Sequence, residues 1–155
     1  MKSINFLNIP KLDIPEDFYY SKVYYKSKAS SGYTSYVIDD DRVLEQIKLI
    51  FPDFIINEIG GIFLQEINPG FNQKIHIDPR SIAINYILDL GGETETFFPL
   101  TGQFYKIELH KWHWFYANRP HAVRNVLSLR KSITLSMHKM PSTQSLNWLI
   151  NYSSI

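Results

Sequence analysis

The chain of 155 residues contains no cysteine, which excludes disulfides, thiolate catalysis and cysteine-ligated zinc or iron–sulfur centres. It also lacks any apolar run near the roughly 20 residues that a membrane-spanning helix needs. The segment from Met1 to Phe6 is not the long apolar stretch of a signal peptide. The net charge of +1 argues against tight binding of duplex nucleic acid. We therefore expect a cytoplasmic protein without a membrane partner.

The composition is that of a globular protein rich in β-structure. Apolar residues make up 45% and charged residues 20%, and the aromatic share of 15% favours strands. The length fits one domain with a substantial core. We expect a single domain over 1–155, in which 1–58 supply a supporting strand and helix, 59–140 a β core, and 141–155 a C-terminal helix or tail.

Short strands separated by turns dominate the pattern. Acids at 39–41 precede apolar residues at helical spacing and predict a helix that ends near Pro52. A loop is predicted at 30–32 and a second helix over 143–152. Predicted strands cover 18–28, 60–67, 75–78, 82–90, 103–109, 112–117, 121–127 and 130–138. The fold class is thus mainly β (α+β), an antiparallel sandwich or jelly roll with one or two flanking helices.

His76 and Asp78 form a His-x-Asp pair, and His121 follows 43 residues after Asp78. Residues i and i+2 of a strand point to the same side, so His76 and Asp78 can hold one metal ion together. A folded sheet is needed to bring His121 to the same point. Two imidazoles and one carboxylate hold a non-haem ferrous ion on one face and leave the other positions open for chemistry.

Other readings of the histidines remain open. His110 and His113 compete with His121 for the third ligand position or have structural roles, and His138 is expected at the surface. Zinc and manganese accept the same nitrogen and oxygen ligands.

The strand predicted over 130–138 has one polar face, on which Arg130, Ser132, Thr134 and Ser136 alternate with apolar residues. If that face turns inward, Arg130 is a buried cation that needs an anion. A carboxylate bound by the guanidinium, with help from the Ser132 hydroxyl, satisfies it. Arg124 is the alternative anchor. An outward polar face at a sheet edge is the structural alternative.

Two further polar residues lie near the motif. Asn85 interrupts an apolar strand, so its amide needs a partner if it is buried. Arg80 follows the carboxylate of the motif closely and is a candidate contact for substrate or cosubstrate.

The stretch from about 62 to 138 resembles the Fe(II)/2-oxoglutarate-dependent dioxygenases, in their small prolyl-hydroxylase-like or phage-type branch. The matching elements occur in order: Asn68-Pro69-Gly70, His76-Ile77-Asp78, Asn85-Tyr86-Ile87-Leu88, Gly91-Gly92-Glu93-Thr94, Asn118-Arg119-Pro120-His121 and Arg130-Lys131-Ser132. The resemblance covers about half of the chain. It implies a double-stranded β-helix, cupin-like core in which His76, Asp78 and His121 hold Fe(II), Arg130 and Ser132 bind the far carboxylate of 2-oxoglutarate, and Asn85 contacts this cosubstrate.

As the resemblance implies, the reaction is a hydroxylation that uses O2 and releases succinate and CO2. The branch favours an amino-acid or peptidyl side chain as substrate. Two alternatives differ in class: a cupin-like metal-binding protein or isomerase without oxygenase activity, and a dioxygenase that acts on nucleic acid. The second rests on charge distribution, since Glu108 is the last acid and six Lys or Arg follow it.

Overall fold

The computed structural model describes residues 2–18, 23–30, 32–70 and 73–154. Its strands are β1 (Asn5–Phe6), β2 (Val23–Ser30), β3 (Tyr33–Ile38), β4 (Gly61–Ile67), β5 (Ile82–Asp89), β6 (Glu95–Phe98), β7 (Gln103–Lys106), β8 (Trp112–Tyr116), β9 (Ala122–Arg124) and β10 (Arg130–Met137). Its helices are α1 (Asp41–Ile50), α2 (Asp53–Ile56) and α3 (Thr143–Asn151).

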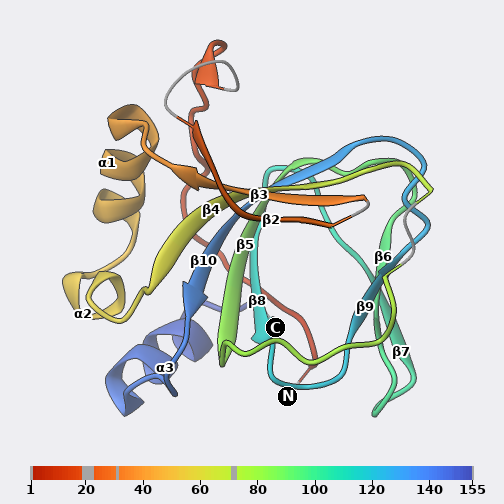
Figure 1. The fold of residues 1–155 in the computed structure, drawn as a ribbon. Helices are drawn as coiled ribbons and strands as arrows, with labels where there is room; N and C mark the ends of the chain where they lie inside the picture. Colours follow the sequence, from red (N-terminus) through yellow and green to blue (C-terminus); the bar gives the residue numbers. More distant parts are fainter. Residues whose placement is uncertain (1, 19–22, 31, 71–72, 155) are drawn as a thin grey trace.

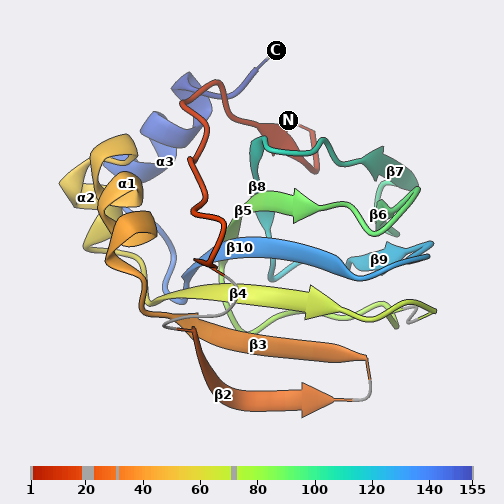
Figure 2. The same ribbon diagram turned by 90° about the horizontal axis from the view of Figure 1, so that it is seen from above.

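The described strands form two antiparallel sheets that face each other. The larger sheet has the order β1-β8-β5-β10-β4-β3-β2, and the smaller has the order β7-β6-β9. From β4 onward the chain passes repeatedly between the sheets, since β5, β8 and β10 lie in the larger sheet whereas β6, β7 and β9 lie in the smaller. This interleaving is that of a jelly roll, as predicted. Figures 1 and 2 show the smaller sheet on one side of the larger and the helices on the other.

The two faces of the larger sheet are buried against different partners. One face packs against the helices through a core that includes Ile84, Trp114 and Leu135 together with Val43 and Ile47 of α1. The opposite face packs on the smaller sheet through a second cluster. Its members are Ile4, Ala83, Ile87, Phe98, Ile107, Phe115 and Ala117. The central strands are therefore covered on both sides, and polar groups on the second face lie inside the sandwich.

Local sequence explains where α1 begins and ends. The Asp40 carboxylate accepts a hydrogen bond from the backbone N–H of Arg42 at the N-cap. Val43 and Ile47, one turn apart, are buried on the same side of the helix. The helix ends at Ile50, because Phe51 is extended and Pro52 follows.

Several predicted elements differ from the observed ones. The described residues contain three helices instead of one or two, since the single turn α2 follows Pro52. Strand β3 was not predicted, although its aromatic and β-branched residues favour a strand. The strand predicted over 75–78 is wrong in extent: the chain makes an isolated bridge at His76. Of the strand predicted over 18–28, residues 19–22 lie outside the described ranges.

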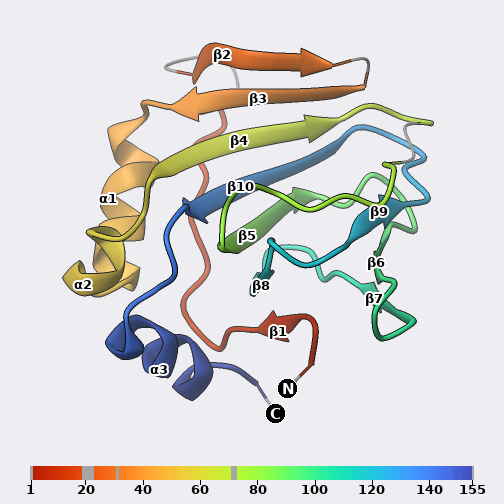
Figure 3. The same cartoon turned by 60° about the horizontal axis from the view of Figure 1, so that its bottom comes forward.

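The two terminal segments meet at the edge of the larger sheet. β1 pairs with β8, and Leu7 bridges to Ser153 just after α3 (Figure 3). The Ser154 backbone N–H donates to the Phe6 carbonyl oxygen at 2.7 Å. In the part of the chain that the structure describes, no helix has the length and apolarity needed to cross a membrane.

Candidate metal centre

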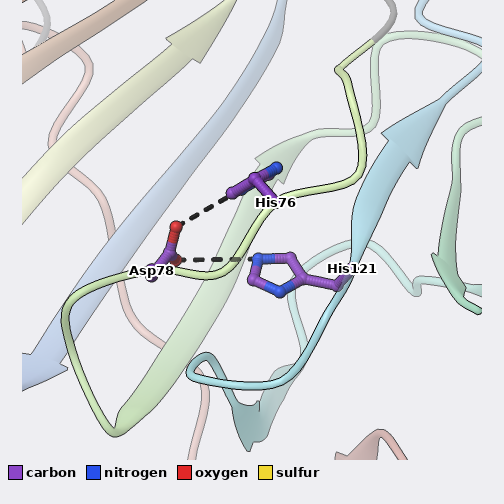
Figure 4. A group of neighbouring side chains, drawn as sticks. All are labelled: His76, Asp78 and His121. Atoms are coloured by element: carbon purple, nitrogen blue, oxygen red, sulfur yellow. Dashed lines mark ion pairs between the residues drawn. The ribbon is translucent and has the colours of Figure 1, made fainter. Parts of the chain in front are cut away.

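His76, Asp78 and His121 converge at the edge of the smaller sheet (Figure 4). His76 and His121 face each other in a bridge, where each backbone N–H donates to the other carbonyl oxygen at 3.0 Å. Asp78 is placed by its own N–H, which donates to the Ala117 carbonyl oxygen. One nitrogen or oxygen atom from each of the three side chains lies within 4.8 Å of the others. A single ion could contact all three.

The imidazoles are oriented for coordination through Nε2. The Nδ1 atom of His76 lies 2.8 Å from the Lys74 carbonyl oxygen, and that of His121 lies 2.8 Å from the Arg119 carbonyl oxygen. A carbonyl oxygen can only accept, so each Nδ1 carries the proton. The neutral ring then has its lone pair on Nε2, the atom that faces Asp78. Such a backbone hydrogen bond is the usual way in which a protein fixes the tautomer of a metal-binding histidine.

Asp78 is held as an anion. His76 Nε2 lies 3.3 Å from its Oδ1, and His121 Nε2 lies 3.6 Å from its Oδ2. Burial alone would raise the pKa of Asp78, but the hydrogen bonds with both histidines and the charge of Arg80 outweigh burial and hold this pKa well below its usual range. A carboxylate that stays ionised is the form that a cation binds.

Arg80 contacts the metal motif rather than an open site. Its Nε and Nη2 lie 3.0 and 2.9 Å from Asp78 Oδ2, and its Nη1 donates to the Ser136 hydroxyl oxygen at 2.9 Å. The guanidinium thus links Asp78 to the end of β10. Both contacts with Asp78 use Oδ2, so the other carboxylate oxygen, Oδ1, remains free of Arg80 and faces His76.

The proton on His76 gives the site a pH dependence. The hydrogen bond with Asp78 raises the pKa of His76 above 6.5, against a lowering by burial. This pair therefore stabilises the apoprotein fully below pH 6.5, and the contribution is lost as the pH rises through the raised pKa. Metal binding needs the neutral ring, so the affinity for Zn²⁺ should rise over the same interval.

Thermal unfolding in a chelator and Zn²⁺ titration, both from pH 5.5 to 8.5, measure these opposite slopes. His76→Gln should flatten the histidine contribution in the apoprotein. An identical pH slope in wild type and His76→Gln would contradict this assignment.

Arg130 is buried at the start of β10, as the inward-face prediction requires. Its exposed fraction is 6%, and its Nη1 has no hydrogen-bond partner among the described residues. Burial lowers its pKa to about 10, so the guanidinium remains charged at neutral pH. A buried cation with an unused N–H lacks the anion that would stabilise it.

Gly91 packs closely against the backbone where β10 begins at Arg130. Its φ is +70°, and a Cβ at this position would lie 2.7 Å from the Ser128 carbonyl oxygen and 2.8 Å from Arg130 Cβ. The Gly91 carbonyl oxygen accepts from the backbone N–H groups of Leu127 and Ser128. A glycine is therefore required by both conformation and space.

The other predicted anchors lie on the same inner face. Ser132 follows Arg130 at the same parity of β10 and is half-buried. Asn85 of β5 lies opposite Thr134, whose hydroxyl donates to Asn85 Oδ1 at 2.7 Å. Asn85 thus has a structural partner whatever else it contacts. Arg124, the alternative anchor, is half-buried on β9 in the other sheet.

The remaining histidines lie outside the three-residue group. His110 and His138 are exposed, and His138 packs against Gly60. His113 is buried on β8, where its Nε2 contacts the Asn85 amide nitrogen at 3.4 Å. The expectation of a surface His138 is confirmed. Single-strand patterns could not link His113 to Asn85 because that contact depends on the register between β8 and β5.

Aromatic side chains enclose His121. Its ring contacts Phe115 and Phe98 at centroid distances of 5.0 and 6.2 Å. Phe98 also forms part of a pocket of about 150 Å³. The lining of the pocket is Ser3, Phe98, Leu100, Thr101, Tyr116, Arg119 and Pro120. The metal centre and this pocket therefore share one aromatic side chain.

No protein-family model and no curated protein matches the chain. Solved structures similar to it include a predicted oxalate decarboxylase from Thermotoga maritima, with 13% identity and a TM-score of 0.48 over 75% of this chain and 91% of that one. A prolyl-4-hydroxylase from Pseudomonas putida has 15% identity and a TM-score of 0.46 over 75% and 78%. Ribosomal oxygenase YcfD from Escherichia coli has 12% identity and a TM-score of 0.45, over 96% of this chain and 43% of that one. At these values none of them assigns a family or an activity.

Proposed function

We propose that this chain is an Fe(II)- and 2-oxoglutarate-dependent oxygenase that hydroxylates an amino-acid or peptidyl side chain. The observation that carries the proposal is the buried Arg130 guanidinium, whose Nη1 has no partner among the described residues. A metal-binding jelly roll without an anionic ligand would leave that buried cation unpaired. Together with the open set of two histidines and one aspartate, it favours a metal that works with a bound dicarboxylate.

The arrangement of β10 supports the pairing of these two features. Ser136, near the end of the strand, is hydrogen-bonded to Arg80 and through it to Asp78. Arg130 lies at the other end of the strand and at the same parity. One inward face therefore runs from the carboxylate of the metal centre to the guanidinium. The metal centre and the Arg130 guanidinium thus border the same interior.

Each residue has a defined part in the proposed reaction. His76, Asp78 and His121 hold the ion on one face through Nε2 atoms and a carboxylate oxygen. Arg130 and Ser132 bind the far carboxylate of 2-oxoglutarate, and the Asn85 amide lies between them and β8. Bound iron and cosubstrate would supply the oxidative chemistry, in which one O2 provides one oxygen atom to succinate, formed with CO2 from 2-oxoglutarate, and the other to the hydroxylated substrate. Phe98 and Phe115 exclude water from the His121 side.

The pocket beside Phe98 supports the choice of substrate class. A volume of about 150 Å³ suits a group the size of benzene. Leu100 and Tyr116 line it with apolar surface, and Arg119 adds one cation. An amino-acid side chain fits those dimensions. Measuring succinate release across free amino acids, peptides and single-stranded nucleic acids would identify the substrate and separate this proposal from an oxygenase that acts on nucleic acid.

Anaerobic titration with Fe(II) and then 2-oxoglutarate tests the cosubstrate. We expect a weak visible charge-transfer band, because the keto and near-carboxylate oxygens chelate the iron together. Succinate at the same concentration is the control, since it lacks the keto group and should give no band. A protein that binds Fe(II) but develops no band with 2-oxoglutarate would be a metal-binding cupin-like protein instead.

A further inference from the structure

A row of hydrogen-bonded polar side chains crosses the buried face of the larger sheet. Thr134 of β10 has its hydroxyl oxygen 2.7 Å from Asn85 Oδ1 on β5 and 3.1 Å from Gln65 Oε1 on β4. Asn85 Nδ2 lies 3.4 Å from His113 Nε2 on β8. His113 and Thr134 both lie directly opposite Asn85 in the sheet register. The row therefore passes over β10 between Arg130 and Ser136.

The direction of these hydrogen bonds places the proton of His113. The Thr134 hydroxyl has one proton, and the shorter contact directs it to Asn85 Oδ1. The Asn85 amide nitrogen then faces His113 and can only donate. His113 Nε2 is consequently the acceptor, and the neutral ring carries its proton on Nδ1.

Two buried donors in this interior are left without a partner. Among the buried side-chain atoms of the described residues, His113 Nδ1 and Arg130 Nη1 have no hydrogen-bond partner. His113 is 1% exposed. Burial, with a contribution from the positive charge of Arg130, lowers the pKa of His113 to about 3. The ring is therefore neutral at ordinary pH, and the Arg130 charge acts on it.

We propose, building on the oxygenase function above, that His113 is a second anchor for the cosubstrate and donates from Nδ1–H to the same far carboxylate that Arg130 binds. One guanidinium and one carboxylate cancel in charge. A neutral imidazole adds a directed hydrogen bond without a second buried cation. Nothing about His113 in its own strand indicates this role; it follows from the unpartnered Nδ1 and from the register that sets His113 beside Asn85.

Nuclear magnetic resonance of the native protein tests the proton position without any substitution. The chain has five histidines, so selective ¹⁵N labelling of histidine gives few signals. Zn²⁺ serves as the diamagnetic metal. We expect the His113 ring to be protonated on Nδ1, as those of His76 and His121 are, and its Nδ1–H signal to move downfield when 2-oxoglutarate is added. His113→Gln identifies the signal by its loss. A proton on Nε2, or a signal that 2-oxoglutarate leaves unmoved, would overturn the inference.

Ligand binding by His113 variants tests the energetic role. With Zn²⁺ present, calorimetry compares 2-oxoglutarate with 2-oxobutyrate, which lacks the far carboxylate. His113→Phe should weaken 2-oxoglutarate binding by about tenfold or more, as expected for loss of a hydrogen bond to a charged group. It should leave 2-oxobutyrate binding unchanged. His113→Gln, which keeps an N–H donor and also guards against misfolding of the Phe variant, should recover part of the affinity.

His138→Gln is the matched control, because it removes an exposed imidazole just beyond the end of β10. Unchanged 2-oxoglutarate affinity in folded His113→Phe would overturn the role of His113 alone. Wild-type protein that binds Zn²⁺ but not 2-oxoglutarate would overturn the proposed cosubstrate, and the inference with it. An equal loss for both ligands would also overturn the inference, since it would mean that His113 does not contact the far carboxylate.

Discussion

Asp78→Ala is expected to reduce iron-dependent succinate release by about a thousandfold or more. The two remaining histidines leave the ion without its anionic ligand, and Arg80 loses its partner. Affinity for Zn²⁺, measured by competition with a chromophoric chelator, should fall in parallel. The pKa of Asp78 lies well below its usual range, so the ionised carboxylate stabilises the folded apoprotein at neutral pH. Its removal in Asp78→Ala should therefore also lower the stability of the apoprotein.

Two further variants make the Asp78 result specific. Asp78→Asn keeps the shape of the side chain and removes its charge, so a similar loss would assign the effect to the anion. Asp39→Ala removes an exposed carboxylate just before α1 and should change neither succinate release nor metal affinity. Succinate production in Asp78→Ala at the wild-type rate would dispose of the proposed metal centre.

Arg130→Met is expected to raise the 2-oxoglutarate concentration required for half-maximal turnover by about a hundredfold. Removing one partner of a buried, hydrogen-bonded charge pair costs roughly 2–5 kcal/mol, and each 1.4 kcal/mol is a factor of ten. In the apoprotein the sign should be opposite. An unpaired buried cation is costly, so an apolar side chain of similar volume in its place should leave the apoprotein at least as stable as wild type.

The Arg130 experiment therefore has two readouts, cosubstrate titration and thermal unfolding without ligands. Arg130→Lys keeps the charge but not the planar fork and should recover little of the affinity. Arg124→Met is the matched control on β9 and should leave the requirement near that of wild type. An unchanged requirement in Arg130→Met with a raised one in Arg124→Met would move the anchor to the other sheet.

Only the local part of the metal motif was predictable from the sequence. His76 and Asp78 are two residues apart, and the turn before Pro120 leads into His121. Placing His121 beside His76 and Asp78 required the folded arrangement of the chain, which the sequence pattern alone does not give. The polar face of β10 followed from alternation alone, and the burial of Arg130 agrees with it. Their roles as metal ligands and carboxylate anchor stay predictions until the experiments above are done.

Side-chain contacts between neighbouring strands could not be predicted from the sequence. Thr134 meets Asn85, and Asn85 meets His113, because of a register that no single strand encodes. Arg80, a candidate contact for substrate or cosubstrate, binds Asp78 and Ser136, and the second of these lies 56 residues away in sequence. Helix α2 is a single turn and gives too short a period to recognise.

The bridge between His76 and His121 has a consequence for how the protein holds together without its ion. The segment that carries His76 and Asp78 has exposed apolar side chains at Ile75 and Ile77 and joins the smaller sheet beside β9. An ion bound by all three side chains would cross-link the segment of His76 and Asp78 to the segment of His121. Loss of the ion would then loosen this segment first, and its backbone would become accessible to proteases while the sheet face packed against the helices stays intact.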